Sequence, residues 1–270
     1  MLSPLSFTPE FRRRIAELPK AHRLEWLASL AARRSGYTEG DRRGTLADLE
    51  AELREVARAC RADMVAAIEK QLGPFDSAHL RALLEVPRES FVRPEDMARS
   101  AEDTPLPLDD EGLATISAPH AYLLSYRLLE LAGGDSLLEL GTGSGYVSAL
   151  ASYIVGADEG QVVTVEIDEA LSRWAARLLA RYSNVRALHG DAMHAAEIGR
   201  GAQRVVVTFA VEKIPDAWLE MLGDGGKLVA PVGPSNQDQR LVRVVRKGRE
   251  LTTTDHGAVR FVRNRSSEAT

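Results

Sequence analysis

Three glycines at alternate positions, Gly141, Gly143 and Gly145, come directly after a short apolar run that begins at Leu137. Because glycine has no Cβ, a turn built in this way can bend sharply and let a ligand touch backbone amides. The next residues, from Tyr146 onward, have a helical pattern. A strand that passes into a helix through such a turn is typical of open α/β sheets, which bind ligands at the carboxyl ends of their strands. This segment therefore predicts both the class of fold and the place of a binding site.

Beyond residue 135, short apolar runs alternate with helical stretches, which is the pattern of a mostly parallel, doubly wound sheet. Near the carboxyl terminus the apolar runs are separated only by short turns, which predicts an antiparallel hairpin at the edge of the sheet. The expected strands are 137–140, 162–167, 185–188, 205–209 and 228–232, the expected helices are 146–153, 169–181 and 215–222, and the hairpin is expected within 241–245, 251–254 and 259–262.

The first 60 or so residues are charged and helical in pattern, unlike the rest of the chain. An amphipathic stretch containing Leu24 and Leu27 is expected to end near Gly36, and the polar run 36–44 resembles a turn. Thr45, with an acidic residue three positions later, resembles a capping box at the start of a helix that lasts until Gly73-Pro74. We therefore expect a helical extension over 1–60 and a catalytic domain over 61–270.

Composition excludes several classes of function. The net charge of −5 argues against partners held by bulk electrostatics, so neither nucleic acid nor a membrane surface is expected. Cys60 is the one cysteine, and the six histidines have none of the spacings that zinc sites require, so no metal is expected. Met1 to Ile15 is too charged for a signal peptide, which indicates a cytoplasmic protein. The sequence does not predict the oligomeric state.

Two carboxylates narrow the prediction of which ligand binds at the glycine turn. Glu166 ends the second strand, 21 residues after Gly145, where it could accept both hydroxyl protons of a ribose, and Asp191 comes after the third strand. The glycines read G-x-G-x-G rather than the dinucleotide pattern G-x-G-x-x-G, and Glu139 would repel a pyrophosphate while favouring a cationic amino group. S-adenosyl-L-methionine, leaving as S-adenosyl-L-homocysteine, is therefore the expected cofactor. The predicted cofactor-binding residues are Glu139, Gly141, Thr142, Gly143, Ser144, Gly145, Glu166, Ile167, Asp191 and Ala192.

Several further blocks, within roughly residues 62–263, carry a more specific likeness. The blocks are Val86-Pro-Arg-Glu-Ser-Phe-Val92, Asp103-Thr-Pro-Leu-Pro-Leu108, Thr115-Ile-Ser-Ala-Pro-His120, Leu138-Glu-Leu-Gly-Thr-Gly-Ser-Gly-Tyr146, Ile214-Pro215, Gly225-Gly-Lys-Leu-Val-Ala-Pro-Val-Gly233 and Val259-Arg-Phe-Val262. With these blocks the chain resembles the protein-L-isoaspartate O-methyltransferases, Rossmann-like class I enzymes. The glycine turn alone would indicate only the superfamily, whereas the blocks at 115–120 and 231–233 narrow the resemblance to this family.

The resemblance implies methyl transfer from S-adenosyl-L-methionine to the free carboxylate of an isoaspartyl residue in a protein or peptide. It also places Ser117 at the position of the family's active-site serine, where the hydroxyl would aim the acceptor carboxylate. An alternative interpretation of Ser117 is that it only caps the helix beginning at Pro119. His120, in the first turn of that helix, is left outside the expected site.

The chain departs from the family pattern at three places. Residues 208–215 are bulkier than usual after the fourth strand and include the charge pair Glu212 and Lys213. Arg263 stands where a proline is usual, within a basic run that includes Arg260 and Arg265. An acidic cluster at 109–111 precedes the block that contains the serine, and could select a basic peptide.

Three other interpretations stay open from the sequence. The first keeps the chemistry but esterifies an aspartate of a dedicated precursor peptide, guided by the amino-terminal extension. The second is a nucleic-acid base methyltransferase, which the segment Thr208-Phe-Ala-Val211 disfavours because it lacks an amide-and-proline clamp. The third is a sensor that binds the cofactor without turnover.

Overall fold

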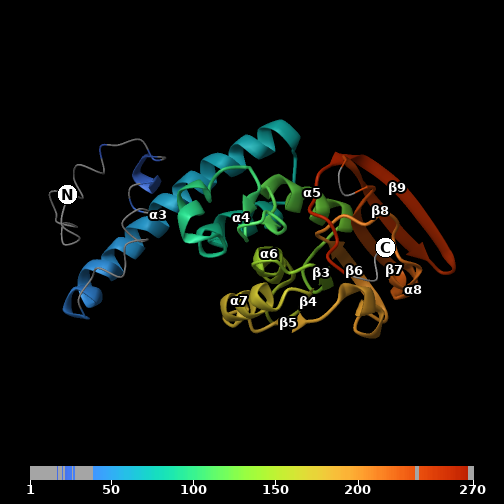
Figure 1. Ribbon diagram of the computed structural model, residues 1–270. Helices are drawn as coiled ribbons and strands as arrows, with labels where there is room; N and C mark the ends of the chain where they lie inside the picture. Colours follow the sequence, from blue (N-terminus) through green and yellow to red (C-terminus); the bar gives the residue numbers. More distant parts are fainter. Residues whose placement is uncertain are drawn as a thin grey trace.

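The computed structural model describes residues 17, 20, 22–25, 27, 39–234 and 237–266, with side chains from residue 51 onward in the long helix that begins at 39. Figure 1 shows a twisted sheet flanked by helices, with the long helix α3 reaching away from it. Most of the expected amino-terminal extension, including residues 1–16 and 28–38, lies outside the described residues. Within the described part of the chain, no helix combines the length and apolar character needed to cross a bilayer.

A seven-stranded sheet forms the centre of the molecule, in the order β5-β4-β3-β6-β7-β8-β9. Strands β3 to β7 are parallel, and β8 and β9 add an antiparallel hairpin. The predicted doubly wound sheet is thus confirmed, and β3 lies where the strand order reverses. The strands are β3 (Ser136–Leu140), β4 (Gln161–Glu166), β5 (Val185–His189), β6 (Ala202–Val207), β7 (Leu222–Val232), β8 (Gln239–Lys247) and β9 (Glu250–Val259).

Side chains alternate across the sheet and bury both of its faces. On β3, Leu137 belongs to one core cluster and Leu138 to the other, and on β7 Leu228 and Val229 divide in the same way. This alternation results from the two-residue period of a strand. Helices α5, α6 and α7 contribute to the first cluster, while α8 and the 3-10 helix η4 cover the second. The helices are α4 (Ser77–Glu85), α5 (Pro119–Leu129), α6 (Tyr146–Val155), α7 (Glu169–Leu179), α8 (Asp216–Glu220) and η4 (Ala192–Glu197).

The amino-terminal region differs from the sequence prediction. Helix α3 (Glu39–Leu72) begins inside the run expected to be a turn, and it passes Thr45 without a break, so the predicted capping box is wrong. Residues 45–72 have favourable helix propensity, and helix formation is cooperative. The helix therefore extends back through the polar residues 39–44. Leu24 and Leu27 are fully buried in a small cluster with Leu53, Val56 and Ala57 of α3, so the residues around 24–27 pack against this helix.

The carboxyl-terminal tail is also different from expectation. The run 259–262 does not form a third antiparallel strand, because β9 ends at Val259 and the chain then crosses to β6. There the Ala210 amide donates to the Val262 carbonyl at 2.7 Å, and the Asn264 amide donates to the Ala210 carbonyl at 3.2 Å. These bonds place the tail alongside the carboxyl end of β6, at the edge of the sheet that the glycine turn occupies.

Candidate active site

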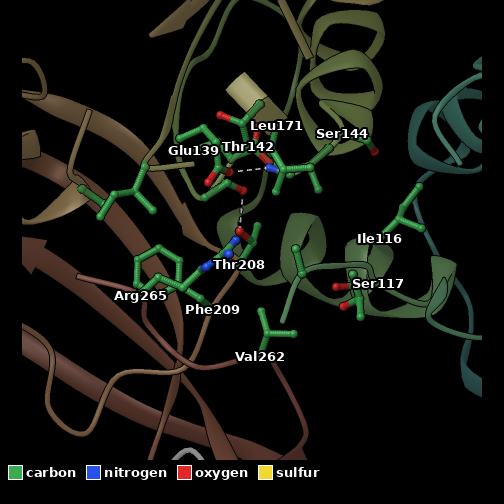
Figure 2. Close-up of a pocket in the computed structure, with 18 of the residues that line it drawn as sticks. Ile116, Ser117, Glu139, Thr142, Ser144, Leu171, Thr208, Phe209, Val262 and Arg265 are labelled. Carbon is green, nitrogen blue, oxygen red and sulfur yellow. Dashed lines mark hydrogen bonds between the residues drawn. The ribbon is translucent and has the colours of Figure 1, made fainter. Parts of the chain in front are cut away.

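A cleft opens at the carboxyl ends of the parallel strands. Figure 2 shows the labelled side chains around this single space, with Ser117 and Glu139 on different sides of it. Gly145 is an exception among the predicted site residues, because it does not line the cleft: it precedes α6 at φ +89° and packs against Leu179. The predicted residues that line the cleft are Ser117, Glu139, Gly141, Thr142, Gly143, Ser144, Glu166, Ile167, Asp191 and Ala192.

The glycine turn is held against the end of β6. Gly141 has φ +96°, a conformation that suits glycine, and its Cα faces Thr208 and Phe209 so closely that a Cβ would lie 2.4 Å from Thr208 Oγ1. The Thr208 hydroxyl donates to the carbonyls of Leu140 and Gly141, at 3.0 and 2.5 Å. These contacts hold the turn in one conformation, in which its backbone faces the cleft.

Glu139 is a fully buried carboxyl group in the wall of the cleft. Its Oε2 accepts hydrogen bonds from the hydroxyls of Ser148 and Thr164. Its Oε1 has no partner among the residues that the structure describes. Burial, opposed by those two hydrogen bonds, raises the pKa of Glu139 to about 8. An unsatisfied buried carboxylate oxygen is what a ligand with a cationic amino group would pair with.

The two outer carboxylates are oriented by backbone amides. Glu166 accepts from the amides of Gly143 at 2.8 Å and Asp168 at 3.0 Å, and burial raises its pKa. Asp191 caps η4 by accepting from the Met193 amide at 2.8 Å, and its other oxygen accepts from the Ser266 hydroxyl at 2.5 Å. Each carboxylate therefore both caps a turn and lines the cleft, and because a carboxylate can accept about four hydrogen bonds, both can still receive a ligand.

Ser117 faces these groups from the acceptor side. It lies between β2 (Thr115–Ile116) and α5, and it is half-buried. The cap of α5 is Ala118, with no side-chain capping bond, so the interpretation of Ser117 as a helix cap is wrong. The buried phenol of Tyr122 is hydrogen-bonded to Ser117. Tyr122 belongs to α5 and also lines the cleft, so this bond links Ser117 to the body of the helix at the cleft wall.

Some of the charged residues that depart from the family pattern lie away from the cleft. Glu212 and Lys213 are exposed and do not line the cleft, and Lys213 pairs with Asp216, so this charge pair is not part of the cleft wall. In the acidic cluster, Asp110 pairs with Arg93 at 2.7 Å. The bulky residue that does reach the cleft is Phe209.

The tail contributes residues that the sequence pattern did not assign to the cofactor cleft. Val262, Arg263 and Arg265 line it, whereas Arg260 does not. The Arg265 guanidinium lies 3.4 Å from Asp168 and 4.0 Å from Asp109, so it links the N-cap of α7 to the loop that precedes β2. The basic run that contains Arg263 and Arg265 was the sequence feature that could have indicated these residues. Its position at the strand ends depends on the crossing of the tail to β6.

Comparison with known proteins agrees with this geometry. A profile of the protein-L-isoaspartate(D-aspartate) O-methyltransferases matches residues 61–269. The chain is 40% identical to protein-L-isoaspartate O-methyltransferase of Pyrobaculum arsenaticum over 67% of this chain and 87% of that protein. It is 38% identical to the Vibrio parahaemolyticus enzyme of the same name, over 74% and 94%. The chain belongs to the protein-L-isoaspartate O-methyltransferase family.

A solved structure shows the same fold. A beta-aspartate methyltransferase from Plasmodium falciparum, in complex with S-adenosyl-L-homocysteine, superposes with a TM-score of 0.66 at 20% identity, over 75% of this chain and 97% of its own. As a member of the protein-L-isoaspartate O-methyltransferase family, the chain is an S-adenosyl-L-methionine-dependent enzyme with a class I fold. The resemblance drawn from the sequence motifs is therefore confirmed.

The residues of the cleft fit this cofactor. Besides Glu139 Oε1, the hydroxyl of Ser144 is buried and has no hydrogen-bond partner among the described residues. The glycine turn leaves room for a ligand against its backbone, and Glu166 and Asp191 add acceptors farther along the same edge. We propose that Glu139 pairs with the cofactor's amino group and that Glu166 and Asp191 bind its ribose and adenine.

The raised pKa of Glu139 gives a testable pH dependence. Its ordinary value is 4.5 and its folded value about 8, so between these the folded state holds a proton that the unfolded state has lost. Its contribution to stability is therefore complete below about pH 4.5 and is lost as pH rises through 8, at about 1.4 kcal/mol per unit. Glu139→Gln should therefore gain stability relative to wild type from pH 5 to 8.5, measured by thermal unfolding without cofactor. A parallel shift of both proteins would contradict this.

Glu166 offers a prediction about cofactor affinity. Glu166→Gln turns an amide N–H₂ toward a backbone donor and removes a charged acceptor. The change should weaken S-adenosyl-L-homocysteine binding by about 1–3 kcal/mol, the scale of a hydrogen bond to a charged group. Titration calorimetry measures the loss. Glu169→Gln is the matched control, because Glu169 is exposed, pairs with Arg173 and does not line the cleft.

Proposed function

We propose that this enzyme transfers the methyl group of S-adenosyl-L-methionine to the free carboxylate of an L-isoaspartyl residue in a protein or peptide. The observation that supports it best is that Ser117 and the glycine turn line one cleft, so acceptor and cofactor can meet there. Family membership supports the same acceptor. The product would be a methyl ester and S-adenosyl-L-homocysteine.

The chemistry asks little of acid–base groups. An acceptor carboxyl with a pKa near 4 is ionised at neutral pH, so no general base is required. The cofactor supplies a methyl group on a sulfonium, which is a good leaving group. Ser117 would donate a hydrogen bond to the acceptor carboxylate and aim it, and holding reactants in line can lower a barrier by several kcal/mol. His120 is paired with Asp103 and does not line the cleft.

Apolar side chains would exclude water from the acceptor side. Ile116, Leu113, Phe209 and Val262 line the cleft together with Ser117. Removing water strengthens the hydrogen bonds that the acceptor accepts and keeps hydroxide away from the methyl donor. Phe209 is held by an edge-to-face contact with the fully buried Trp218, at 6.1 Å between ring centroids, so that wall is well anchored.

We also propose that residues 1–60 form an extension and that 61–270 form the catalytic domain. The start of the family match at residue 61 supports this division. The boundary falls inside α3 rather than at a loop. The cluster that Leu24 and Leu27 form with α3 also packs against Met97 and Ala101 of the catalytic domain, which supports a role for the extension as an added helical layer.

The acceptor is tested with two peptides that differ only in linkage. Purified enzyme is incubated with S-adenosyl-L-methionine carrying a labelled methyl group and either an L-isoaspartyl peptide or its aspartyl isomer. Base-labile label should appear on the isoaspartyl peptide alone. Equal labelling, or none, would contradict repair-type methylation. Labelling of neither peptide with intact cofactor binding would favour a dedicated peptide acceptor or a sensor.

A further inference from the structure

We propose that Arg88 is a positioning residue for methyl transfer, which holds Ser117 in place through the serine's own carbonyl group. This inference rests on the proposed function. Arg88 lies in the 3-10 helix η2 (Arg88–Ser90), away from the cleft, and does not contact the reacting groups. Its effect would be exerted on the backbone that carries the hydroxyl.

Arg88 is fully buried and donates four hydrogen bonds to backbone carbonyls. Nη1 donates to Ser100 at 3.0 Å and to Glu102 at 2.9 Å. Nη2 donates to Thr104 at 2.8 Å and to Ser117 at 3.1 Å. The guanidinium is planar and rigid. It therefore fixes three carbonyl groups of the 100–104 segment and the carbonyl of Ser117 relative to one another.

This arrangement carries an energetic cost that packing alone does not explain. Burial lowers the pKa of Arg88, which shows that its charge is unfavourable in this environment. Nothing in the described part of the chain gives the guanidinium a carboxylate ion-pair partner. An apolar side chain of similar size often stabilises a core at least as well as a buried charge. The guanidinium differs from an apolar side chain in that its hydrogen bonds are directional. They select one arrangement of four carbonyl groups that belong to no common helix or strand.

A second contact ties the same segment to the other side of Ser117. Asp103 accepts from the His120 amide at 3.0 Å and from His120 Nδ1 at 2.9 Å. The segment 100–104 thus contacts residue 117 through Arg88 and residue 120 through Asp103. The N-cap residue Ala118 makes no capping bond, so these contacts restrain the backbone around the serine together with the hydrogen bond between Tyr122 and Ser117. A displacement of about 1 Å at such a position can lower turnover about 100-fold.

The experiment compares Arg88→Lys and Arg88→Met with Arg61→Met. Arg61 is the matched control because it too is a buried arginine, and it pairs with Glu89, the neighbour of Arg88, without contacting Ser117. Arg88→Met should lower kcat on the isoaspartyl peptide by about 100-fold. Arg88→Lys, which keeps a donor, should recover part of it. Affinity for S-adenosyl-L-homocysteine should stay within about threefold. Arg61→Met should lower thermal stability and leave kcat unchanged.

A double-mutant cycle separates positioning from stability. Once Ser117→Ala has removed the hydroxyl, Arg88→Lys should lower kcat no further, since coupled residues are not additive. Additive losses would overturn the proposal. So would a kcat that falls equally in Arg61→Met, or failure of both Arg88 variants to fold, which would make Arg88 a core residue only.

A second measurement tests the role of Arg88 independently of whether the enzyme methylates an isoaspartyl peptide. Amide hydrogen exchange over 115–121 should be faster in Arg88→Lys than in wild type and in Arg61→Met. This can be measured even if the wild-type enzyme methylates no isoaspartyl peptide, in which case the proposed function fails while the role of Arg88 is still judged. Unchanged exchange over 115–121 would overturn the proposal for Arg88.

Discussion

Replacing Gly141 with alanine is expected to reduce affinity for S-adenosyl-L-homocysteine by about 100-fold, which corresponds to about 2.7 kcal/mol. The backbone there has φ +96°, and a Cβ would lie 2.4 Å from Thr208 Oγ1 and 2.8 Å from Phe209 Cδ1. A strained conformation and an overpacked contact each cost about 1–3 kcal/mol. The turn would relieve both by moving into the cleft, where the cofactor binds. Calorimetric titration measures the loss.

Gly134→Ala is the control for backbone strain. Gly134 has φ +80°, has nothing within 4 Å of a Cβ, and lies outside the cleft. The variant should lose stability and keep its affinity for S-adenosyl-L-homocysteine. If the two variants lost affinity equally, the effect would come from general destabilisation and not from the turn.

Removing the hydroxyl of Ser117 is expected to lower kcat about 100-fold on an isoaspartyl peptide, the scale of losing one aligned hydrogen-bond donor. The hydroxyl would be the group that directs the acceptor carboxylate. Affinity for S-adenosyl-L-homocysteine should be unchanged, because the predicted cofactor contacts come from other strand ends. Steady-state kinetics with a methyl-labelled cofactor, together with calorimetry, give the two quantities.

Ser125→Ala is the matched substitution for Ser117→Ala. Ser125 lies on α5, and its hydroxyl donates to the Ala121 carbonyl at 2.9 Å, away from the cleft. The variant should retain wild-type kcat. An unchanged kcat in Ser117→Ala would remove the serine from the mechanism, and a loss of cofactor binding would assign it to the cofactor site instead.

The parallel core of the fold could be predicted because its signals are local. Apolar runs such as the one at Leu137 mark each strand, and the glycines after it mark the turn. Glu166 and Asp191 could be assigned to one edge because carboxyl ends of parallel strands meet there. Their second role as caps of the adjoining turns could not be predicted with certainty, since capping and ligand binding use the same residue types.

The remaining features depend on contacts between distant segments. Arg265 lies at the cleft only because the tail pairs with Ala210, some 50 positions earlier, and no local pattern records that crossing. The network of Arg88 joins residues up to 29 positions apart. The start of α3 at Glu39 could not be predicted for a different reason, because polar residues such as those at 39–44 are compatible with either a turn or a helix.

Helix α3 has 34 residues and so forms a rod roughly 51 Å long at 1.5 Å per residue. The rod passes residue 60 without a joint, and Arg61 on it is paired with Glu89. Motion of its outer half therefore cannot be absorbed at the family boundary by a hinge. A displacement of the outer half would therefore be transmitted along α3 to α4, which α3 contacts through the bonds of Arg58 to Glu85 and of Arg61 to the Leu84 carbonyl.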